Sequence, residues 1–234
     1  MMKNKSLHIE GFKASIPIVV GYLPIAMAFG MLSKTTGISL LDSLLLSIMV
    51  FAGASQFMAL NLLALGVATG EIIVATLLMN MRHLLMSASI AARIKEEYNK
   101  YFPLVAFGIT DETFSIAMTK KGYLRVAFLI PLELASYSSW VGGTLLGYLA
   151  GELLPELVQS SMGVALYAMF VAILIPEAKK KKSIAFLAIS SGLLNSLIIY
   201  FKLLSPGWSL IFSIIIVAIA GVYIIKPEEV TDYE

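Results

Sequence analysis

Long apolar stretches, separated by short polar breaks, follow one another along the whole chain. A helix needs about 20 apolar residues to cross the hydrocarbon core of a bilayer. The pattern therefore predicts membrane-spanning helices over residues 14–32, 41–65, 71–92, 102–119, 124–150, 157–176, 184–204 and 208–225. The most polar break contains four consecutive lysines, Lys179 to Lys182. Such a run is typical of a cytoplasmic loop.

The composition agrees with a membrane protein and excludes several other classes. Hydrophobic residues make up 59% and charged residues 14% of the chain, against about 45–50% and about 25% in soluble domains. A net charge of +2 gives no indication of a nucleic-acid partner. There is no cysteine, which excludes a disulfide framework, a thiol nucleophile and a thiolate metal site. The first apolar stretch is preceded by lysines but has no small-residue cleavage site, so we expect a retained helix.

These observations predict an all-α integral membrane protein. We expect a polytopic bundle of 7–8 transmembrane helices that forms one transporter domain over residues 1–234, multi-pass in the cell (cytoplasmic) membrane. Two topologies fit the sequence. Eight crossings place both ends in the cytoplasm, whereas seven crossings with an outside N-terminus result if 102–119 enters and returns on one side. The distribution of basic residues does not decide between them.

The two halves of the chain, 12–93 and 126–204, show a weak internal similarity. Pro17 and Pro131 open comparable spans, and Asn80 and Asn195 occupy the third span of each half. The similarity indicates either two structural repeats or chance matches between apolar segments. In transporters with repeats, the substrate binds near the bilayer midplane, where helices are broken.

Uncharged polar residues inside the apolar spans are candidates for substrate binding. Pro17 and Pro24 produce either a simple kink or a broken first helix. In the second span Gly53 is a weak point followed by Ser55 and Gln56, and a buried amide must find partners. In the third span the polar residues fall at helical spacing on one face, which should turn toward a cavity or another helix; they are Thr76, Asn80, His83 and Ser87.

Charged residues inside the spans are expensive and usually functional. Arg82 lies in the third span and the neighbours Asp111 and Glu112 lie in the fourth. We predict that Arg82 extends to the membrane interface, pairs with one of these acids or contacts the substrate. His83 is either a hydrogen-bonded core residue or a proton carrier, because its unperturbed pKa is about 6.5. Together Arg82, His83, Asp111 and Glu112 are the predicted proton-coupling or charge-pair residues.

A row of small residues in the fifth span predicts a close helix contact, within the chain or with a partner. Gly143, Gly147 and Gly151 are spaced four residues apart, and glycine rows of this kind let helix backbones approach closely. A further acid, Glu133, precedes this row inside an apolar run.

Four motifs together resemble the AzlC family of branched-chain amino acid exporters. They are Gly21-Tyr22-Leu23-Pro24 with Phe29-Gly30, Phe51-Ala52-Gly53-Ala54-Ser55-Gln56-Phe57, Asn80-Met81-Arg82-His83 and Thr110-Asp111-Glu112-Thr113. The third motif has Met81 where leucine is expected. The resemblance implies export of branched-chain or related apolar amino acids, driven by the proton gradient. It also implies a small hydrophobic AzlD-like partner subunit in the same membrane.

Other classes of function fit the sequence less well. A passive channel or a membrane sensor for a small polar solute is the main alternative. An intramembrane enzyme is disfavoured because the chain has neither HExxH nor GxSxG, no cysteine and only two histidines. We therefore expect no enzymatic activity, no metal and no cofactor.

Overall fold

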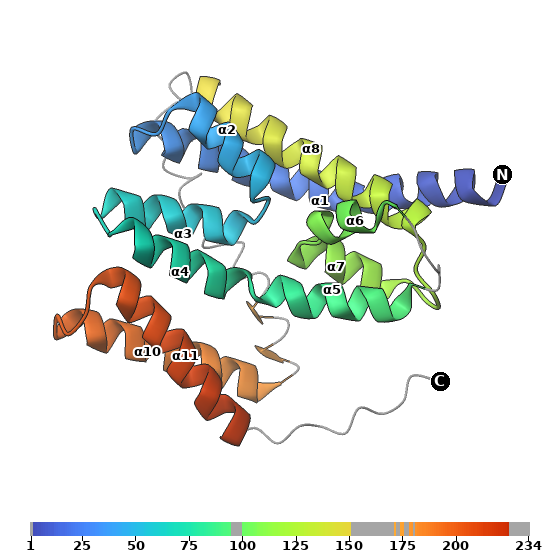
Figure 1. Cartoon of the computed structure of the whole chain (residues 1–234). Coiled ribbons are helices and arrows are strands. Elements are labelled where there is room, and N and C mark those ends of the chain that lie inside the picture. The colour runs from blue at the N-terminus through green and yellow to red at the C-terminus, as the bar shows by residue number, and fades with distance from the viewer. Residues whose placement is uncertain are drawn as a thin grey trace.

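A computed structural model describes residues 2–94, 100–150 and 181–224, together with 171, 174, 175, 178 and 179. Within these residues the regular secondary structure is helical, apart from one β-bridge between Ile94 and Leu124, and turns or short loops join the helices. The helices are α1 (Met2–Thr35), α2 (Leu40–Met49), α3 (Gly53–Ala64), α4 (Thr69–Asn80), α5 (Arg82–Arg93), α6 (Phe102–Gly108), α7 (Asp111–Thr119), α8 (Val126–Ala150), α10 (Lys182–Tyr200) and α11 (Pro206–Ile224). Figure 1 shows their arrangement.

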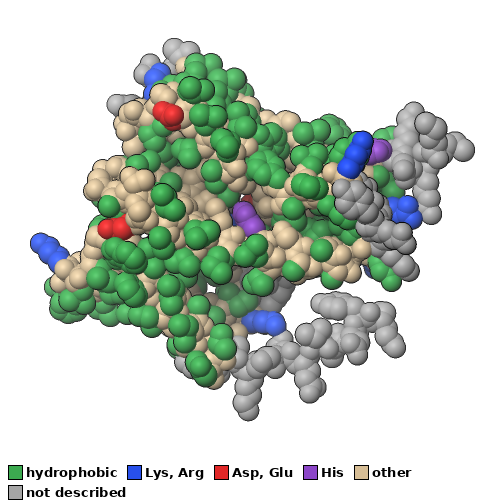
Figure 2. Space-filling model, in the orientation of Figure 1, with side chains coloured by type: hydrophobic (Ala, Val, Ile, Leu, Met, Phe, Trp, Pro, Cys, Tyr) green, Lys and Arg blue, Asp and Glu red, His purple; other side chains and the backbone are tan. Residues whose placement is uncertain are grey.

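The prediction of an all-α membrane protein is confirmed, but the number of crossings is not. Four helical runs of the described residues are long and apolar enough to cross a membrane, namely Ser6–Thr35, Thr69–Arg93, Lys182–Tyr200 and Pro206–Tyr223. The predicted span 157–176 lies almost wholly outside the described residues. Hydrophobic side chains are spread over the whole surface seen in Figure 2, and few charged side chains are visible among them.

Three of the predicted spans are interrupted near their middle. The span 41–65 breaks between α2 and α3, where Phe51 has a φ of 44°, a conformation that non-glycine residues rarely adopt. The span 71–92 is interrupted at Met81, and 102–119 breaks at Ile109 and Thr110. The first span, in contrast, is one continuous helix that includes Pro17 and Pro24.

Two of the interrupted spans fold back instead of crossing. In Figure 1, α2 runs toward the middle of the molecule and α3 returns toward the end where α2 began. The α6–α7 pair does the same from the opposite end, and α7 finishes where Arg93 of α5 reaches the backbone of Lys120 and Gly122. We call these pairs the α2–α3 hairpin and the α6–α7 hairpin. Their tips meet in the middle of the molecule, whereas α4 and α5 continue in one direction.

Helices α1 and α8 run parallel in close contact over most of their lengths. Gly11 of α1 lies against Phe128 near the start of α8, and Gly147 near the end of α8 lies against Met27 of α1. A Cβ atom at Gly143 would lie 2.6 Å from the Cβ of Ala26. The predicted glycine row thus packs against α1 through Gly143 and Gly147, while Gly151 lies outside the described residues.

Replacing Gly147 by leucine should separate α1 from α8. Any side chain at this position would overlap the backbone of Met27. The overlap can be removed only if α1 or α8 moves as a whole. We expect strongly reduced yield of folded protein, measured by size-exclusion chromatography of a fluorescent fusion in detergent. Gly142→Leu is the matched control, because nothing lies within 4 Å of a Cβ at Gly142. Equal yields of the two variants would contradict this packing.

The last two helices form a separate antiparallel pair that packs on α4. The hydroxyl of Ser205 donates a hydrogen bond to Glu71 Oε2 at 2.5 Å, and Ile211 packs with Ile72 and Ala75. Asn195 lies inside the unbroken helix α10, whereas Asn80 ends α4. The two proposed repeats, 12–93 and 126–204, therefore stay a prediction that the described residues do not confirm.

Candidate functional site

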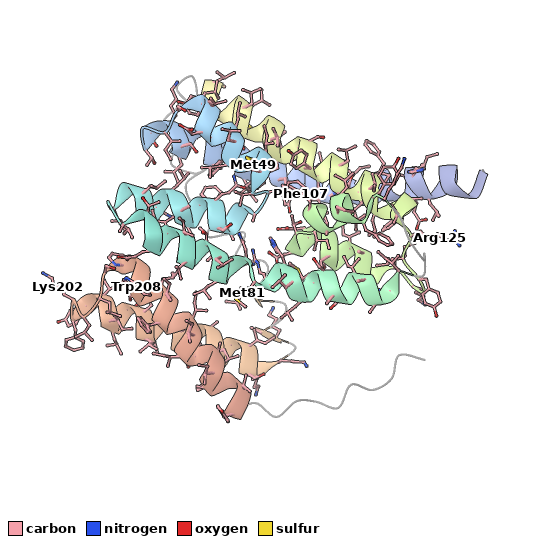
Figure 3. All side chains as sticks on the ribbon, viewed as in Figure 1. Met49, Met81, Phe107, Arg125, Lys202 and Trp208 are labelled. Atoms are coloured by element: carbon pink, nitrogen blue, oxygen red, sulfur yellow. The ribbon has the colours of Figure 1, made fainter. Side chains whose placement is uncertain are left out.

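The interruptions of the three broken spans surround one cavity in the middle of the molecule. Figure 3 shows Met49, Met81 and Phe107 near this meeting point, with Arg125 and Lys202 at opposite ends. The cavity has a volume of about 20 Å³, which is enough for about one water molecule. Its walls come from five elements and are formed by Tyr22, Phe51, Ala52, Gly53, Ala54, Arg82, His83, Thr110, Asp111, Glu112 and Trp140.

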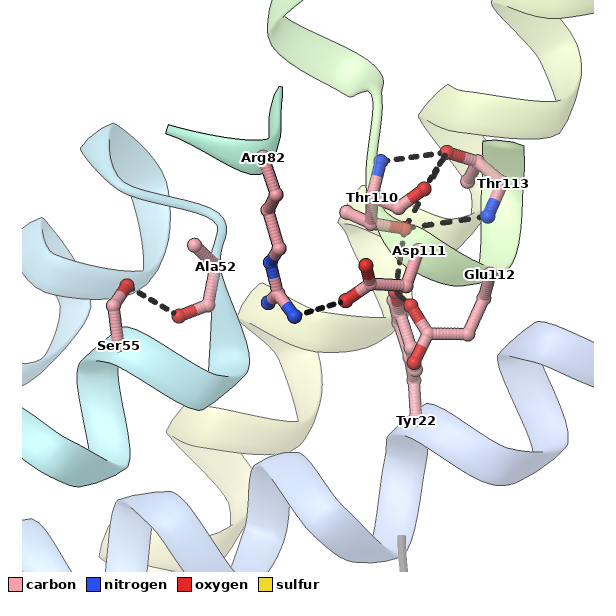
Figure 4. Close-up of polar contacts among 8 residues, drawn as sticks. All are labelled: Tyr22, Ala52, Ser55, Arg82, Thr110, Asp111, Glu112 and Thr113. Atoms are coloured by element: carbon pink, nitrogen blue, oxygen red, sulfur yellow. Dashed lines mark hydrogen bonds and ion pairs between the residues drawn. The ribbon is translucent and has the colours of Figure 1, made fainter. Parts of the chain in front are cut away.

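An ion pair connects the third span to the tip of the α6–α7 hairpin. Arg82 at the start of α5 places Nη1 2.9 Å from Oδ2 of Asp111 (Figure 4). The two side chains are 36% and 28% exposed, so the pair is neither fully buried nor free in solvent. The structure brings Arg82 to Asp111, one of the two acids that the sequence offered as its partner.

Glu112 points away from Arg82 and binds α1 instead. The hydroxyl of Tyr22 donates a hydrogen bond to Glu112 Oε2 at 2.5 Å and lies 2.7 Å from Oγ1 of Thr110 (Figure 4). Adjacent residues on a helix differ by about 100° in direction, which explains why the two acids have different partners. The tip of the α6–α7 hairpin is thus attached both to the third span and to α1.

The start of α7 is fixed by its own sequence. Thr110 and Thr113 form a capping box, in which each hydroxyl accepts a hydrogen bond from the backbone N–H of the other, at 2.8 and 3.3 Å. This satisfies amide groups that a helix start leaves without partners. Asp111 and Glu112 occupy the first turn, where the helix dipole favours negative charge. The motif Thr-Asp-Glu-Thr is therefore a helix N-terminus placed in the middle of the molecule.

Two polar atoms near the cavity are buried and have no hydrogen-bond partner among the described residues. They are Nε of Arg82 and Oδ1 of Asn80. Buried polar atoms are normally paired, so this unpaired donor and this unpaired acceptor, on either side of the interruption at Met81, can bind a ligand or water. Asn80 ends α4 and does not line the cavity, whereas Arg82 and His83 do.

The predicted substrate residues of the second span divide into two groups. Gly53 lines the cavity and touches Trp140, since a Cβ here would lie 2.5 Å from the indole ring. Gln56 is buried and outside the lining; it donates to Ser47 Oγ at 3.1 Å and accepts from Trp140 Nε1 at 3.0 Å. Ser55 donates to the carbonyl of Ala52 and is also buried. The structure therefore uses Gln56 to connect α2, α3 and α8.

An aromatic cluster forms the apolar wall of the cavity. The ring of Tyr22 makes edge contacts with Phe51 and Trp140, at centroid distances of 6.3 and 5.2 Å. Phe51 also packs against Tyr137 and Phe107, so it joins the tips of both hairpins to α8. Edge-to-face contacts of this kind are favourable geometries for aromatic pairs.

Three features of the site are not predicted by the sequence. They are the places of Tyr22 and Trp140 in the cavity wall and the interruption at Met81. A detectable signal existed for α7, because Thr110 and Thr113 with acids between them are a helix-start signature inside an apolar run. No local signal marks Trp140, which reaches the cavity only because α8 packs beside α1 and α3.

The comparisons with known proteins identify the family. The model of the AzlC protein family matches residues 17–154. The chain belongs to the AzlC family. It is 37% identical over 194 residues to an uncharacterized membrane protein of Archaeoglobus fulgidus, covering 82% of this chain and 84% of that protein. It is 34% identical over 200 residues to the inner membrane protein YgaZ of Escherichia coli, covering 82% of each.

A third relative carries a functional name. The branched-chain amino acid transport protein AzlC of Bacillus subtilis is 28% identical over 176 residues, covering 74% of this chain and 68% of that protein. No solved structure matches the chain. The AzlC region includes every residue that lines the cavity, whereas α10 and α11 lie outside it. This AzlC protein is thus a membrane protein with relatives named for membrane location or transport, and none of these three is named as an enzyme.

Proposed function

We propose that this AzlC protein is a secondary transporter that exports branched-chain or related apolar amino acids, coupled to protons. The observation that carries the proposal is the cavity itself, where a cation, two acids and an aromatic wall meet between the tips of two opposed hairpins. The name of the Bacillus subtilis relative supports the class of substrate. Export, proton coupling and a small AzlD-like subunit are further parts of the proposal, drawn from the family resemblance.

The charges of the cavity match a zwitterion. Arg82 can bind the carboxylate of an amino acid, because guanidinium groups bind carboxylates with two parallel hydrogen bonds. Asp111 can bind the ammonium group once the substrate separates it from Arg82. An apolar side chain would then lie against Phe51 and Trp140. The ion pair seen here would be exchanged for two ion pairs with the substrate.

The small volume of the cavity requires movement. About 20 Å³ holds about one water molecule and no amino acid, so the hairpin tips must separate for binding. Each hairpin leads to one end of the molecule (Figure 1). Movement of the α2–α3 hairpin would open the cavity to one side of the membrane, and movement of the α6–α7 hairpin to the other.

Efflux from cells tests the proposed function. Cells that express the chain together with a small AzlD-like subunit, after loading with leucine, isoleucine, valine or methionine, should release the amino acid faster than cells with either protein alone. Release at the same rate in all strains would contradict export. A membrane sensor would show no transport, and a passive channel would show no stimulation by amino acid on the opposite side.

The distribution of basic side chains supports one orientation in the membrane. Arg125 lies at the end of the molecule that carries the start of α1 (Figure 3). Lys120 pairs there with Glu10 of α1, and Arg93 binds the backbone of Lys120 and Gly122. The opposite end carries Lys34 and Lys202, and Lys181 and Lys182 lie at the other end of α10 from Lys202. Basic residues favour the cytoplasmic side, so we propose a cytoplasmic N-terminus.

Cysteine labelling checks this orientation directly, because the chain has no cysteine of its own. Lys202→Cys should react with a membrane-impermeant maleimide added to intact cells. Arg125→Cys should react only after the membrane is opened, since it lies at the other end (Figure 3). The reverse pattern would place the N-terminus outside.

Gln56→Ala and Asn80→Ala should differ in their effects on stability and on substrate affinity. Because its amide is satisfied by Ser47 and Trp140, Gln56→Ala should lower the stability by about 0.6–2 kcal/mol and leave the substrate affinity nearly unchanged. Asn80→Ala should weaken leucine binding, since Oδ1 of Asn80 has no partner among the described residues. Leucine titrations and thermal unfolding of both purified variants check this contrast. A large loss of affinity in Gln56→Ala with unchanged stability would return Gln56 to the binding site.

A further inference from the structure

A third carboxyl group, besides those of Asp111 and Glu112, is buried close to the cavity but is not part of its wall. Glu133 on α8 is 4% exposed, and neither of its carboxyl oxygens has a hydrogen-bond partner in the described part of the chain. It lies two turns before Trp140 on the same helix, so both project from one side of α8. Nothing in the ion pair or the capping box explains an acid here.

Glu133 lies directly on the backbone of the α6–α7 hairpin. A Cβ atom at Gly108, the last residue of α6, would lie 2.6 Å from Cβ and 2.7 Å from Oε2 of Glu133. Only glycine leaves room for the carboxyl group at this contact. The carbonyl of the same Gly108 accepts a hydrogen bond from Thr113 at 3.1 Å. The contact between Glu133 and Gly108 is therefore linked by one hydrogen bond to the first turn of α7.

The elements packed around Glu133 offer it no charge partner. Helix α6 has no titratable side chain, and the part of α1 at this level, residues 14–18, has none either. Tyr137, one turn further along α8, donates its hydrogen bond to Ile48 of the α2–α3 hairpin. On α7 and α2 the acids are engaged elsewhere: Asp111 with Arg82, Glu112 with Tyr22 and Asp42 with Ser39.

An isolated carboxylate is too costly to bury without a partner, and such a group takes up a proton instead. In the closed arrangement seen here, Glu133 therefore carries a proton and fits between α6 and α8 as a neutral group. Loss of that proton leaves a carboxylate that needs water or a cation. Neither can reach it unless α6 moves away from α8.

We propose that Glu133 is a proton-binding site that controls the α6–α7 hairpin. With its proton bound the hairpin stays against α8 and the cavity is closed on that side. Release of the proton to the aqueous phase charges Glu133, separates α6 from α8 and opens the cavity toward the end that carries the N-terminus. This inference rests on the proposed transport function and specifies where one coupled proton binds.

Transport by Glu133→Gln in proteoliposomes tests the inference. Glutamine has the shape of the protonated acid and cannot ionise, so leucine exchange across the membrane should be retained while uptake driven by a pH gradient falls at least tenfold. His83→Gln is run in parallel, because His83 is another titratable residue in the wall of the cavity. If Glu133→Gln keeps the full response to the pH gradient, the inference is wrong. If the wild-type protein transports no amino acid at all, the proposed function fails instead.

A labelling experiment provides a readout that does not depend on transport. Val105 on α6 is 3% exposed, so Val105→Cys should react slowly with a maleimide at about pH 6. At about pH 9 it should react at least fivefold faster in the protein with Glu133 than in the Glu133→Gln background. The second background cancels the pH dependence of the thiol itself. Equal rates in the two backgrounds at both pH values would overturn the proposal. If Glu133→Gln does not fold, Glu133→Met takes its place, and failure of both to fold would show a structural role for the acid instead.

Discussion

Arg82→Gln should abolish amino acid transport. Arg82 holds Asp111 at the tip of the α6–α7 hairpin, and we propose that it binds the carboxylate of the substrate. Its loss removes the one guanidinium group among the described residues that line the cavity. It also leaves Asp111 without its partner, and breaking a buried pair costs about 3–5 kcal/mol; we expect less than this here because both side chains are partly exposed. Transport and thermal stability of the purified variant are the measurements.

A double-mutant cycle separates the two roles of Arg82. Arg82→Gln combined with Asp111→Asn should regain much of the lost stability, because neither charge is then left alone, but it should not regain transport. Glu112→Gln is the matched control: Glu112 is bound to Tyr22, so it should couple weakly to Arg82. Purely additive effects of Arg82 and Asp111 on stability would contradict the ion pair.

Trp140→Ala should cause a large loss of stability. Trp140 is 2% exposed, packs against Tyr22 and Gly53, and donates to Gln56. Replacing a buried tryptophan by alanine typically costs about 3–5 kcal/mol, and here Gln56 also loses its donor. We expect a large fall in the midpoint of thermal unfolding in detergent.

Two further variants control for the change at Trp140. Trp140→Phe keeps most of the volume and removes the N–H, so its smaller effect measures the hydrogen bond to Gln56. Trp208→Ala removes a tryptophan that is 40% exposed and should change the unfolding midpoint little. Comparable losses for Trp140→Ala and Trp208→Ala would show that Trp140 does not hold the hairpins together.

Much of the site could be predicted because charged side chains in apolar spans are few and are stabilised by pairing with one another. Arg82 and Asp111 lie in successive spans, which limits their partners. The weak point at Gly53 was also predicted, and the chain breaks immediately before it. The close packing of Gly143 and Gly147 follows from their lack of side chains, although the sequence did not show that α1 is their partner.

The hairpins could not be predicted from hydropathy. The stretch 41–65 is as apolar as a crossing helix, because both arms of a hairpin buried in protein or lipid need the same apolar side chains. Length alone cannot distinguish one long helix from two short ones that return. One of the two topologies predicted by the sequence has a returning 102–119 segment, but no signal in the sequence indicates the same for 41–65. The substrate-binding role predicted for Gln56 stays a prediction, because a buried amide can bind protein groups, as Gln56 does with Ser47 and Trp140, as well as a substrate.

Counterflow of radiolabelled leucine into proteoliposomes tests the central claim most directly. The protein is reconstituted with its small subunit and loaded with a high concentration of unlabelled leucine. We predict transient accumulation of the label above equilibrium in the wild type, its absence in Arg82→Gln and its retention in Gln56→Ala. Equal entry of label with and without internal leucine, or unchanged counterflow in Arg82→Gln, would contradict a carrier that binds amino acids between the two hairpins.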